Sequence, residues 1–523
     1  MNLNVSQAAV VAALWLAASI AEAQIYRWDN GQLIPGTESI LPAPGAELDH
    51  LNLEFARLRP FDLTGATFAQ SNISNADFIT SNLSNADFTG ATIAGARFGS
   101  SIGLEQIYST ASYESGNLSG IDLSFAKLPG AQFAGQDLSF ANLDSTVMTD
   151  SNLSGATLRG AYLPFTKLAG ANLSGVQGGF FYFNDFTDTK FVNATAITRM
   201  QDVHLVRTDF SYADLGGVTM NADDMTGAKF IGTNLAWASF YGQKISTADF
   251  SLADLRLATY DFSREQPVLR NTILRAGDVN GFSLLPSDRM IIRSGGPPVT
   301  VHDEFRMQTD SELVFRLTRR PDGPDMVIDM NVVPALAGNL TLEFSDEAKV
   351  YTLVNQTFQL FRWPVSLVPG NDFDHIRLPE HTLWNLSGLY STGNAVFLGG
   401  DMDLDTDGDV DSGDLLGFLS NWTGFKDPTS STRWEPGDSD FDSDVDSADL
   451  LQLLSQWTGA SASQSTLSSG ALTSRQLTTV PESLNCSMMG ISFVFGCIGY
   501  RRRVHRDRNH KSCPTAMSDT ANG

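Results

Sequence analysis

The sequence is poor in cysteine and in basic residues. The three cysteines, Cys486, Cys497 and Cys513, all follow residue 485. The rest of the chain therefore has no disulfide framework, no cysteine-ligated zinc and no thiol chemistry. Lysine and arginine number 34 against 59 aspartate and glutamate residues, a formal net charge of −25. Because nucleic-acid binding needs a basic surface that displaces phosphate counterions, this charge excludes a nucleic-acid-binding body.

The sequence also lacks a recognisable catalytic motif. No Ser/His/Asp set, P-loop or His-Glu-x-x-His motif is legible. The seven histidines are scattered at His50, His204, His302, His375, His381, His505 and His510. With 42% hydrophobic residues, a chain of 523 residues can bury several cores, and its length favours about three or four domains.

The N-terminus reads as a secretory signal peptide, residues 1–23. A run of apolar residues from Ala8 to Ile20 ends just before Ala21-Glu22-Ala23, an A-x-A cleavage pattern. This order is typical of secretory signals. The sequence therefore predicts export, with a mature chain that begins near Gln24.

The C-terminus carries a second targeting pattern over residues 480–503. Val-Pro-Glu-Ser is followed by the mostly apolar stretch 484–500 and then by three arginines; a basic tail, 504–523, ends the chain. This order resembles the PEP-CTERM sorting signal of exported bacterial proteins. The resemblance implies transient or permanent membrane attachment through 484–500 and a location at the cell surface, in the outer envelope or outside the cell. A plain C-terminal membrane anchor is the alternative, and it also keeps the body out of the cytoplasm.

A five-residue period fills residues 51–262. Large apolar residues recur at every fifth position, as at Phe68, Ile73, Phe78, Leu83 and Phe88. Neither a 3.6-residue helix nor a strand of period two keeps such residues on one side. The pattern predicts a solenoid whose fifth side chains return to a common core, with a small residue two positions before each centre. An Asn or Asp often stands one position before it, and we expect that side chain to point into water.

These repeats resemble the pentapeptide-repeat family. The resemblance implies a mainly β fold, a right-handed quadrilateral β-helix with four pentapeptides in each coil, and about ten coils over 51–262. Residues 104–115 (LEQIYSTASYES) break the consensus, and we expect a loop or an irregular coil there. The aspartates recur with the repeat, so we interpret them as solvated faces rather than as paired catalytic carboxylates.

Residues 268–398 lose the five-residue period. Alternating runs such as 289–293 and 339–344 predict strands, and we expect an antiparallel β-rich module. Trp363 and Trp384 could line a sugar-binding platform, but buried packing is the better interpretation.

Two aspartate-rich loops follow in residues 401–458, each with carboxylates at alternate positions of a twelve-residue register. Oxygen ligands in this spacing wrap a Ca²⁺ ion. The first loop offers Asp403, Asp405, Asp407, Asp409, Asp411 and Asp414, and the second offers Asp438, Asp440, Asp442, Asp444, Asp446 and Asp449. Position 6 is Gly408 in the first loop but Ser443 in the second, so we expect tighter binding by the first. A solvated acidic linker is the alternative interpretation.

An amphipathic helix is expected after each loop, over 414–422 and 449–457. Loop and helix in duplicate, with Asp at position 12, resemble dockerin type I modules, which are EF-hand-like. The resemblance implies two bound Ca²⁺ ions and a cohesin-like or other envelope protein as partner. A Ser/Thr-rich flexible linker, 459–479, separates this module from the sorting signal.

Together these features predict a non-catalytic, exported structural or interaction protein with a calcium-dependent docking module. The alternative is a carbohydrate-active or polysaccharide-binding protein that contacts extracellular polysaccharide through the β-helix or the β-rich module. Acids clustered on one face of the rod would favour that alternative.

Overall fold

The computed structural model describes residues 24–242, 244–262, 266–279, 281–293, 296–317, 327–345, 350–364, 372–404, 410, 412–421, 437–440 and 445–456. The expected signal peptide, linker, sorting signal and basic tail lie outside this part of the chain. Within it, no helix has the length and apolar character needed to cross a membrane.

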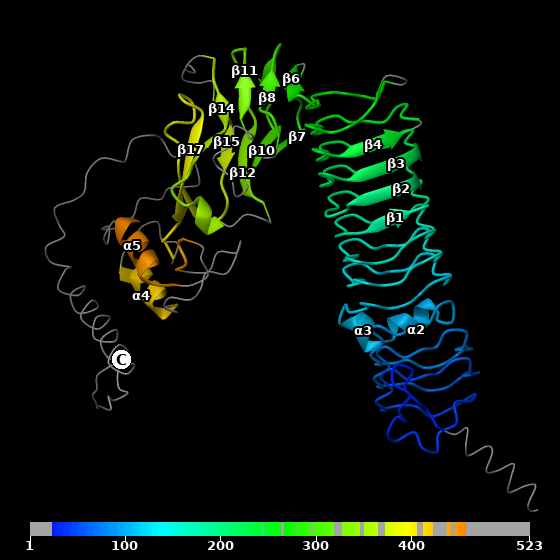
Figure 1. The fold of residues 1–523 in the computed structure, drawn as a ribbon. Helices are drawn as coiled ribbons and strands as arrows, with labels where there is room; N and C mark the ends of the chain where they lie inside the picture. The colour runs from blue at the N-terminus through cyan, green and yellow to red at the C-terminus, as the bar shows by residue number, and fades with distance from the viewer. Residues whose placement is uncertain are drawn as a thin grey trace, which may run out of the picture. The chain divides into compact units, whose positions relative to one another are not determined.

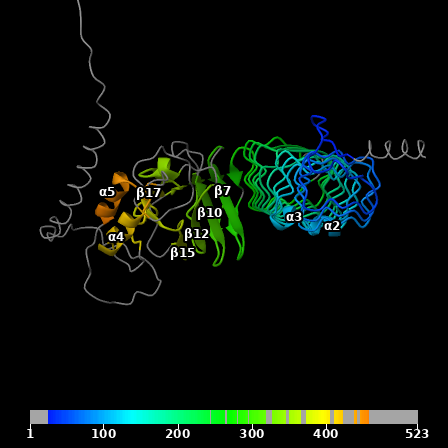
Figure 2. The same ribbon diagram turned by 90° about the horizontal axis from the view of Figure 1, so that it is seen from below.

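A β-solenoid of pentapeptide repeats, with little helix, forms the first half of the described chain (Figure 1). Parallel bridges join each coil to the next at a spacing of four pentapeptides, from Glu47↔Thr67 onward. Seen along their common axis, the coils superimpose (Figure 2). The ladder continues to Asp254↔Ile273. Coil-to-coil pairing therefore begins before residue 51 and ends after residue 262, the limits of the five-residue period in the sequence. The predicted solenoid is confirmed.

Each five-residue unit consists of a bridge, a buried centre and a turn. Phe78, Leu83 and Phe88 are fully enclosed, as the sequence predicts. Phenylalanines of successive coils stack inside the rod, for example Phe68 on Phe88 with ring centroids 5.0 Å apart. The turn residue two positions after each centre has positive φ, as at Asn85 (58°), which explains the many Gly, Asn and Asp residues at this position.

Two short helices interrupt the rod, where the sequence predicted a loop or an irregular coil. They are α2 (Leu104–Tyr108) and α3 (Ala111–Glu114). Their turns satisfy backbone groups that an irregular loop would leave unpaired. The bridge Arg97↔Asp122 encloses one pentapeptide more than the bridges before and after it. The insertion therefore adds one whole repeat, and the period resumes in phase.

A shorter coil follows near the middle of the rod. The bridges Tyr162↔Phe180 and Lys167↔Asp185 enclose less chain than a full coil of four pentapeptides, and Gly178 and Gly179 take φ values of +84° and +127° at the tightened corner. From here one side of the rod forms a regular parallel sheet. Its strands are β1 (Phe180–Tyr182), β2 (Arg199–His204), β3 (Thr219–Asp224) and β4 (Ser239–Gly242).

A short N-terminal segment covers the first coil. Tyr26 and Leu33 pair antiparallel, and Arg27 bridges to Ala56 in the same sense. The Trp28 Nε1–H donates to the carbonyl of Asn75 at 2.7 Å. These contacts shield an edge that would otherwise offer unpaired backbone groups to other chains.

The module that follows the rod is β-rich, but most of its strands are parallel, which corrects the antiparallel expectation. Parallel sheets join β7, β10, β12 and β15; β5, β8, β11 and β14; and β6 with β9, whereas, among the described strands, only β13, β17 and β16 pair antiparallel. The strands are β5 (Asp278–Val279), β6 (Phe282–Leu284), β7 (Arg289–Arg293), β8 (Val299–Val301), β9 (Phe305–Met307), β10 (Glu312–Leu317), β11 (Ile328–Met330), β12 (Asn339–Phe344), β13 (Thr357–Gln359), β14 (Phe361–Arg362), β15 (His375–Arg377), β16 (Thr382–Asn385) and β17 (Asn394–Gly400), with a 3₁₀ helix at Val350–Leu353. Alternation of apolar residues identifies a strand but not the direction of its neighbour, so the sequence could not supply the pairing.

The module has its own hydrophobic core. Ile292, Phe315 and Leu342 stand on the paired strands β7, β10 and β12 and are buried. Trp363 and Trp384 are half-buried against this core, and the Trp363 Nε1–H donates to the carbonyl of Leu389. The packing interpretation of both tryptophans is therefore the one that the structure supports.

A buried arginine joins the end of the rod to the module. Arg256 is fully enclosed and pairs with Asp254, which is equally buried, at 2.7 Å. Its guanidinium also donates to the carbonyls of Arg293 and Pro297. A buried ion pair of this kind is costly to break, because the remaining charge keeps no comparable partner.

Candidate metal centre

The two aspartate loops precede helices α4 (Ser412–Ser420) and α5 (Ser447–Gln456) (Figure 1). The described candidate ligands are Asp403, Asp414, Asp438, Asp440, Asp446 and Asp449. The other six, Asp405, Asp407, Asp409, Asp411, Asp442 and Asp444, lie outside the described residues.

The second loop brings three of its predicted ligands together. Each of Asp438, Asp440 and Asp449 offers a carboxylate oxygen, and these atoms lie within 4.8 Å of one another. Asp438 and Asp449 are each only 1% exposed. Carboxylates so close together repel one another unless a cation or a proton intervenes. Positions 1, 3 and 12 of the predicted register thus meet in the structure, whereas Asp446, at position 9, is not part of this group.

Asp449, at position 12, fastens the start of its own loop. Its Oδ1 accepts the backbone N–H of Ser439 at 2.6 Å and the Ser439 hydroxyl at 2.9 Å. Its Oδ2 accepts the backbone N–H of Asp446 at 2.8 Å. The carboxylate therefore closes the loop from both sides.

The first loop repeats this contact at the same register. Asp414 Oδ1 accepts the backbone N–H of Leu404 at 2.6 Å, and Asp414 is fully buried. In both loops the position 12 carboxylate binds the position 2 N–H. The two loops, which the sequence predicts to be duplicates, therefore share this hydrogen bond in the described residues.

Burial raises the pKa of the Asp449 carboxyl above its usual range, although hydrogen bonds from Asp446, Ser439 and Asp440 act against that shift. A cation beside the carboxylate favours the charged form. Asp446, besides standing at position 9, accepts the N–H of Ala448 at 2.7 Å and so caps the first turn of α5.

A small hydrophobic core lies under both loops. Each loop contributes the residue at its position 8, which is Val410 in the first and Val445 in the second. Phe418 from α4 and Leu453 from α5 complete the core. Because the two loops share this core, ordering one loop also supports the other.

Two glutamines of α5 hold the module to the preceding strand, and sequence reasoning missed them. Gln456 accepts the N–H of Met402 and donates to the carbonyl of Gly400, while Gln452 donates to the carbonyl of Leu398. Ser439, which contacts Asp449, was also missed. No sequence signal distinguishes these residues from ordinary polar surface residues.

The donor set fits a hard divalent cation. All the predicted ligands are carboxylates, and oxygen donors of this kind suit Ca²⁺ better than Zn²⁺ or Cu²⁺. Asp438, Asp440 and Asp449 would hold the ion in the second loop. In the first loop, Asp403 and Asp414 stand at the corresponding positions 1 and 12.

The acids of the rod have a different, structural use. Asp62 and Asp87 each accept the backbone N–H and the hydroxyl of the threonine two residues later, which lowers the pKa of both carboxyls. Asp137 and Asp209 accept backbone N–H groups in the same way. These four acids follow the repeat along the rod, as the sequence indicates, and each accepts a hydrogen bond within its own turn.

One known protein family matches part of the rod. The model for pentapeptide repeats matches in eight copies, over residues 62–99, 117–155 and 137–175. The chain is a pentapeptide-repeat protein. Its pentapeptide repeats amount to about six turns of the β-solenoid. Pentapeptide-repeat proteins are generally non-catalytic.

Solved structures that are similar to this chain share less than a quarter of its residues in the matched part. HetL, which is involved in heterocyst differentiation regulation in the cyanobacterium Nostoc, is 22% identical over 42% of this chain and 90% of its own, with a TM-score of 0.19. Full-length QnrB1, a plasmid-mediated fluoroquinolone resistance protein, is 18% identical over 44% of this chain and 90% of its own, with a TM-score of 0.15. No curated protein matches the chain.

Proposed function

We propose that this pentapeptide-repeat protein is a non-catalytic, exported interaction protein whose 401–458 module binds two Ca²⁺ ions and docks onto a partner in a calcium-dependent way. The single observation that carries the proposal is the shared geometry of the two loops. In each, the position 12 aspartate binds the position 2 N–H, and in the second loop three carboxylates converge.

The negative charge of this module explains why its folding would depend on calcium. Residues 401–449 contain 15 acidic side chains and only two basic ones, Lys426 and Arg433. Such crowding destabilises the folded module, and two divalent cations would offset four of those charges. Helices α4 and α5 would then present Leu416, Leu419 and Leu451, which are exposed, to a cohesin-like or other envelope protein.

The proposal also includes the form of the rod and the location of the protein. The rod would take the right-handed, four-sided form of its family and act as a spacer that presents the docking module. The signal peptide would export the chain, and residues 484–500, behind the PEP-CTERM-like motif, would hold it at the membrane or release it at the cell surface.

Isothermal titration of the full chain, stripped of metal with a chelator, tests calcium binding. The expected stoichiometry is near two, with the 403–414 loop the tighter site. Asp403→Ala and Asp438→Ala should each remove one binding event and leave the other. Injections without heat, or a stoichiometry that neither variant changes, would contradict the proposal.

A matched control uses an acid outside the loops. Asp137 stands on the rod and accepts the N–H of Ser139, so Asp137→Ala removes one negative charge without touching either loop. It should leave the calcium stoichiometry at two. A calcium-dependent pull-down from the native envelope then tests docking, because partners released by chelator should also be lost with the Asp438→Ala variant.

A further inference from the structure

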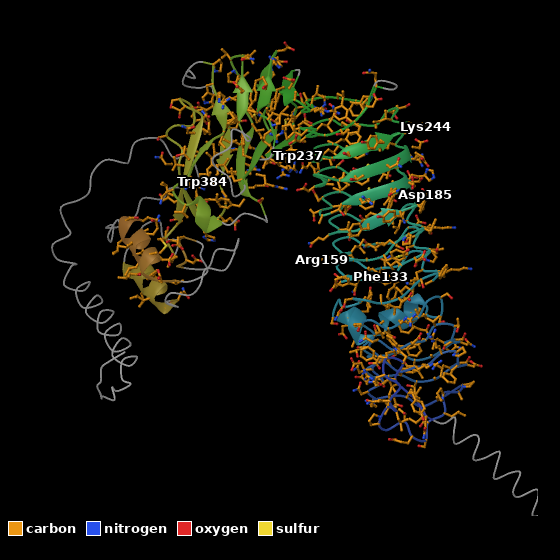
Figure 3. All side chains as sticks on the ribbon, in the orientation of Figure 1. Phe133, Arg159, Asp185, Trp237, Lys244 and Trp384 are labelled. Carbon is orange, nitrogen blue, oxygen red and sulfur yellow. The ribbon has the colours of Figure 1, made fainter. Side chains whose placement is uncertain are left out.

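One side of the rod carries a group of exposed aromatic residues. Its mid-line is a continuous column of bridge partners, Asp122, Asn142, Tyr162, Phe180 and Arg199. Arg159 and Trp237 lie along one edge of the rod, and Asp185 and Lys244 lie along the opposite edge (Figure 3). Six rings occupy the mid-line and its flanking turns and are 46–71% exposed: Phe125, Phe140, Tyr162, Phe165, Phe180 and Phe183. We call this surface the aromatic face.

Folding does not explain these rings. Phe125, Phe140, Phe165 and Phe183 occupy turn positions with φ between 55° and 61°. A bulky side chain is disfavoured in this left-handed region, and Gly or a polar residue occupies most of the other turns of the rod. An exposed phenylalanine at such a position costs backbone energy and gains little burial in return, so its role is sought in binding.

The area of the face is of interface size. At ~150–250 Å² for each whole side chain, the six rings leave roughly 700 Å² exposed. The largest apolar patch on a typical monomer is ~300–600 Å², and a standard protein interface buries about 800 Å² on each partner. With its polar margin, the face is therefore large enough for a stable protein contact.

One pair of these rings is arranged for contact with another protein rather than with a sugar. Phe165 and Phe183 stack with centroids 4.9 Å apart and planes within 6°. Because neighbouring coils lie about 4.8 Å apart, this stack runs along the rod, so one face of each ring is covered by the other. A sugar ring would need an open aromatic face, whereas the edges of stacked rings suit other aromatic rings.

We propose that the aromatic face binds a second copy of the same chain, with the two rods antiparallel and related by a two-fold axis at Tyr162. This proposal goes beyond the calcium-dependent function and does not depend on it. In this register Tyr162 meets the partner's Tyr162, and each coil on one side of it faces the coil equally far on the other side.

Charge and size both match in this register. Asp122 faces Arg199 of the partner subunit, and this pairing occurs twice, once at each end of the face. Phe140 stands two residues before Asn142, as Gly178 stands two before Phe180, so the ring of Phe140 faces a glycine. Arg159 lies at the margin, where its long side chain can turn to solvent.

Charge reversal tests the register. Analytical ultracentrifugation of the purified full chain should show a dimer, both with calcium and with a chelator. Asp122→Arg and Arg199→Asp each place like charges at both ends of the face, and each should weaken the dimer about 100-fold. An equimolar mixture of the two variants should restore a dimer, because each meets an opposite charge only on the other.

Lys190→Glu is the matched control. Lys190 is exposed and stands in a different column of the rod, bridged to Asn172 and Asp209, so its reversal should leave the dimer unchanged. Circular dichroism melts of all variants check that the rods stay folded. Phe165→Asp should give a monomer whose rod still unfolds in a cooperative transition.

Three results would overturn the proposal. One is a monomer at every concentration. Another is a dimer that both charge reversals and Phe165→Asp leave intact. The third is a monomer whose mobility in gels containing a neutral polysaccharide depends on Phe165, which would assign the aromatic face to a glycan.

Discussion

At the scale of single residues, the repeat owes much to the Asn or Asp that precedes each buried centre. The sequence predicted that this side chain points into water. In the structure it is also a hydrogen-bond acceptor for its own turn, as Asn82 is for the N–H of Ser84 at 3.1 Å and Asp87 is for Thr89. The contact connects residues only two apart, so it follows from the consensus once the turn is known.

The lowered pKa values of Asp62 and Asp87 predict how the rod responds to acid. A carboxyl whose pKa is lower in the folded state stabilises the fold above its unfolded pKa, about 4. That stabilisation is lost as the pH falls through the folded pKa. The melting temperature, measured with chelator present, should therefore fall as the pH is lowered from about 4 toward about 2.

Asn at both positions keeps the acceptor oxygen and removes the titration. The double variant Asp62→Asn/Asp87→Asn should therefore lose less melting temperature on acidification than the parent chain. Equal losses in the two proteins would mean that these turns contribute nothing to the acid response.

At the scale of elements, the buried centres of the coils were predictable and the partners of the later strands were not. A period of five leaves only one way to bury Phe78, Leu83 and Phe88 together. Strands β7 and β12 were expected at their observed places, but their parallel pairing with β10 depends on chain crossings that alternation does not encode. The aromatic face was missed because a phenylalanine at a turn looks like any other until its coil neighbours are known.

Removal of one ring from the core tests the coil packing. Phe88 is 1% exposed, stacks on Phe68 and lies edge-on to Phe98. Phe88→Ala should lower the free energy of unfolding by about 3–5 kcal/mol through lost burial and a cavity. Phe88→Leu keeps most of the volume and should cost less than about 1.5 kcal/mol. Urea unfolding followed by circular dichroism measures both, and similar losses would argue against a tightly packed core.

At the scale of the whole molecule, the parts differ in how the sequence specifies them. The rod is encoded by repetition, whereas the 401–458 module, for which we propose calcium binding, is encoded by the register of its acids. That register could be read from the sequence, and Asp414 and Asp449 occupy equivalent places in the structure. The contacts of Gln452 and Gln456 with the strand before the loops could not be read, because they join positions far apart in the chain.

Calcium should therefore stabilise one part of the protein and leave the other unchanged. Differential scanning calorimetry of the full chain should show separate transitions for the rod and for the calcium module. Added calcium should raise only the module transition, by an amount that grows with ligand concentration. A calcium-dependent rise in the rod transition would show that the two parts unfold together.

The coil-to-coil ladder also determines how the rod responds to force. Between its two ends, the described rod is held together by ladder bonds from each coil to the coils before and after it, so tension on one end loads a single layer at a time. Under a steady pull the rod should peel in steps, each freeing one coil, or about 70 Å of extended chain. Such a rod would lengthen under tension by unfolding coil by coil, which limits the force on the parts of the protein at its two ends.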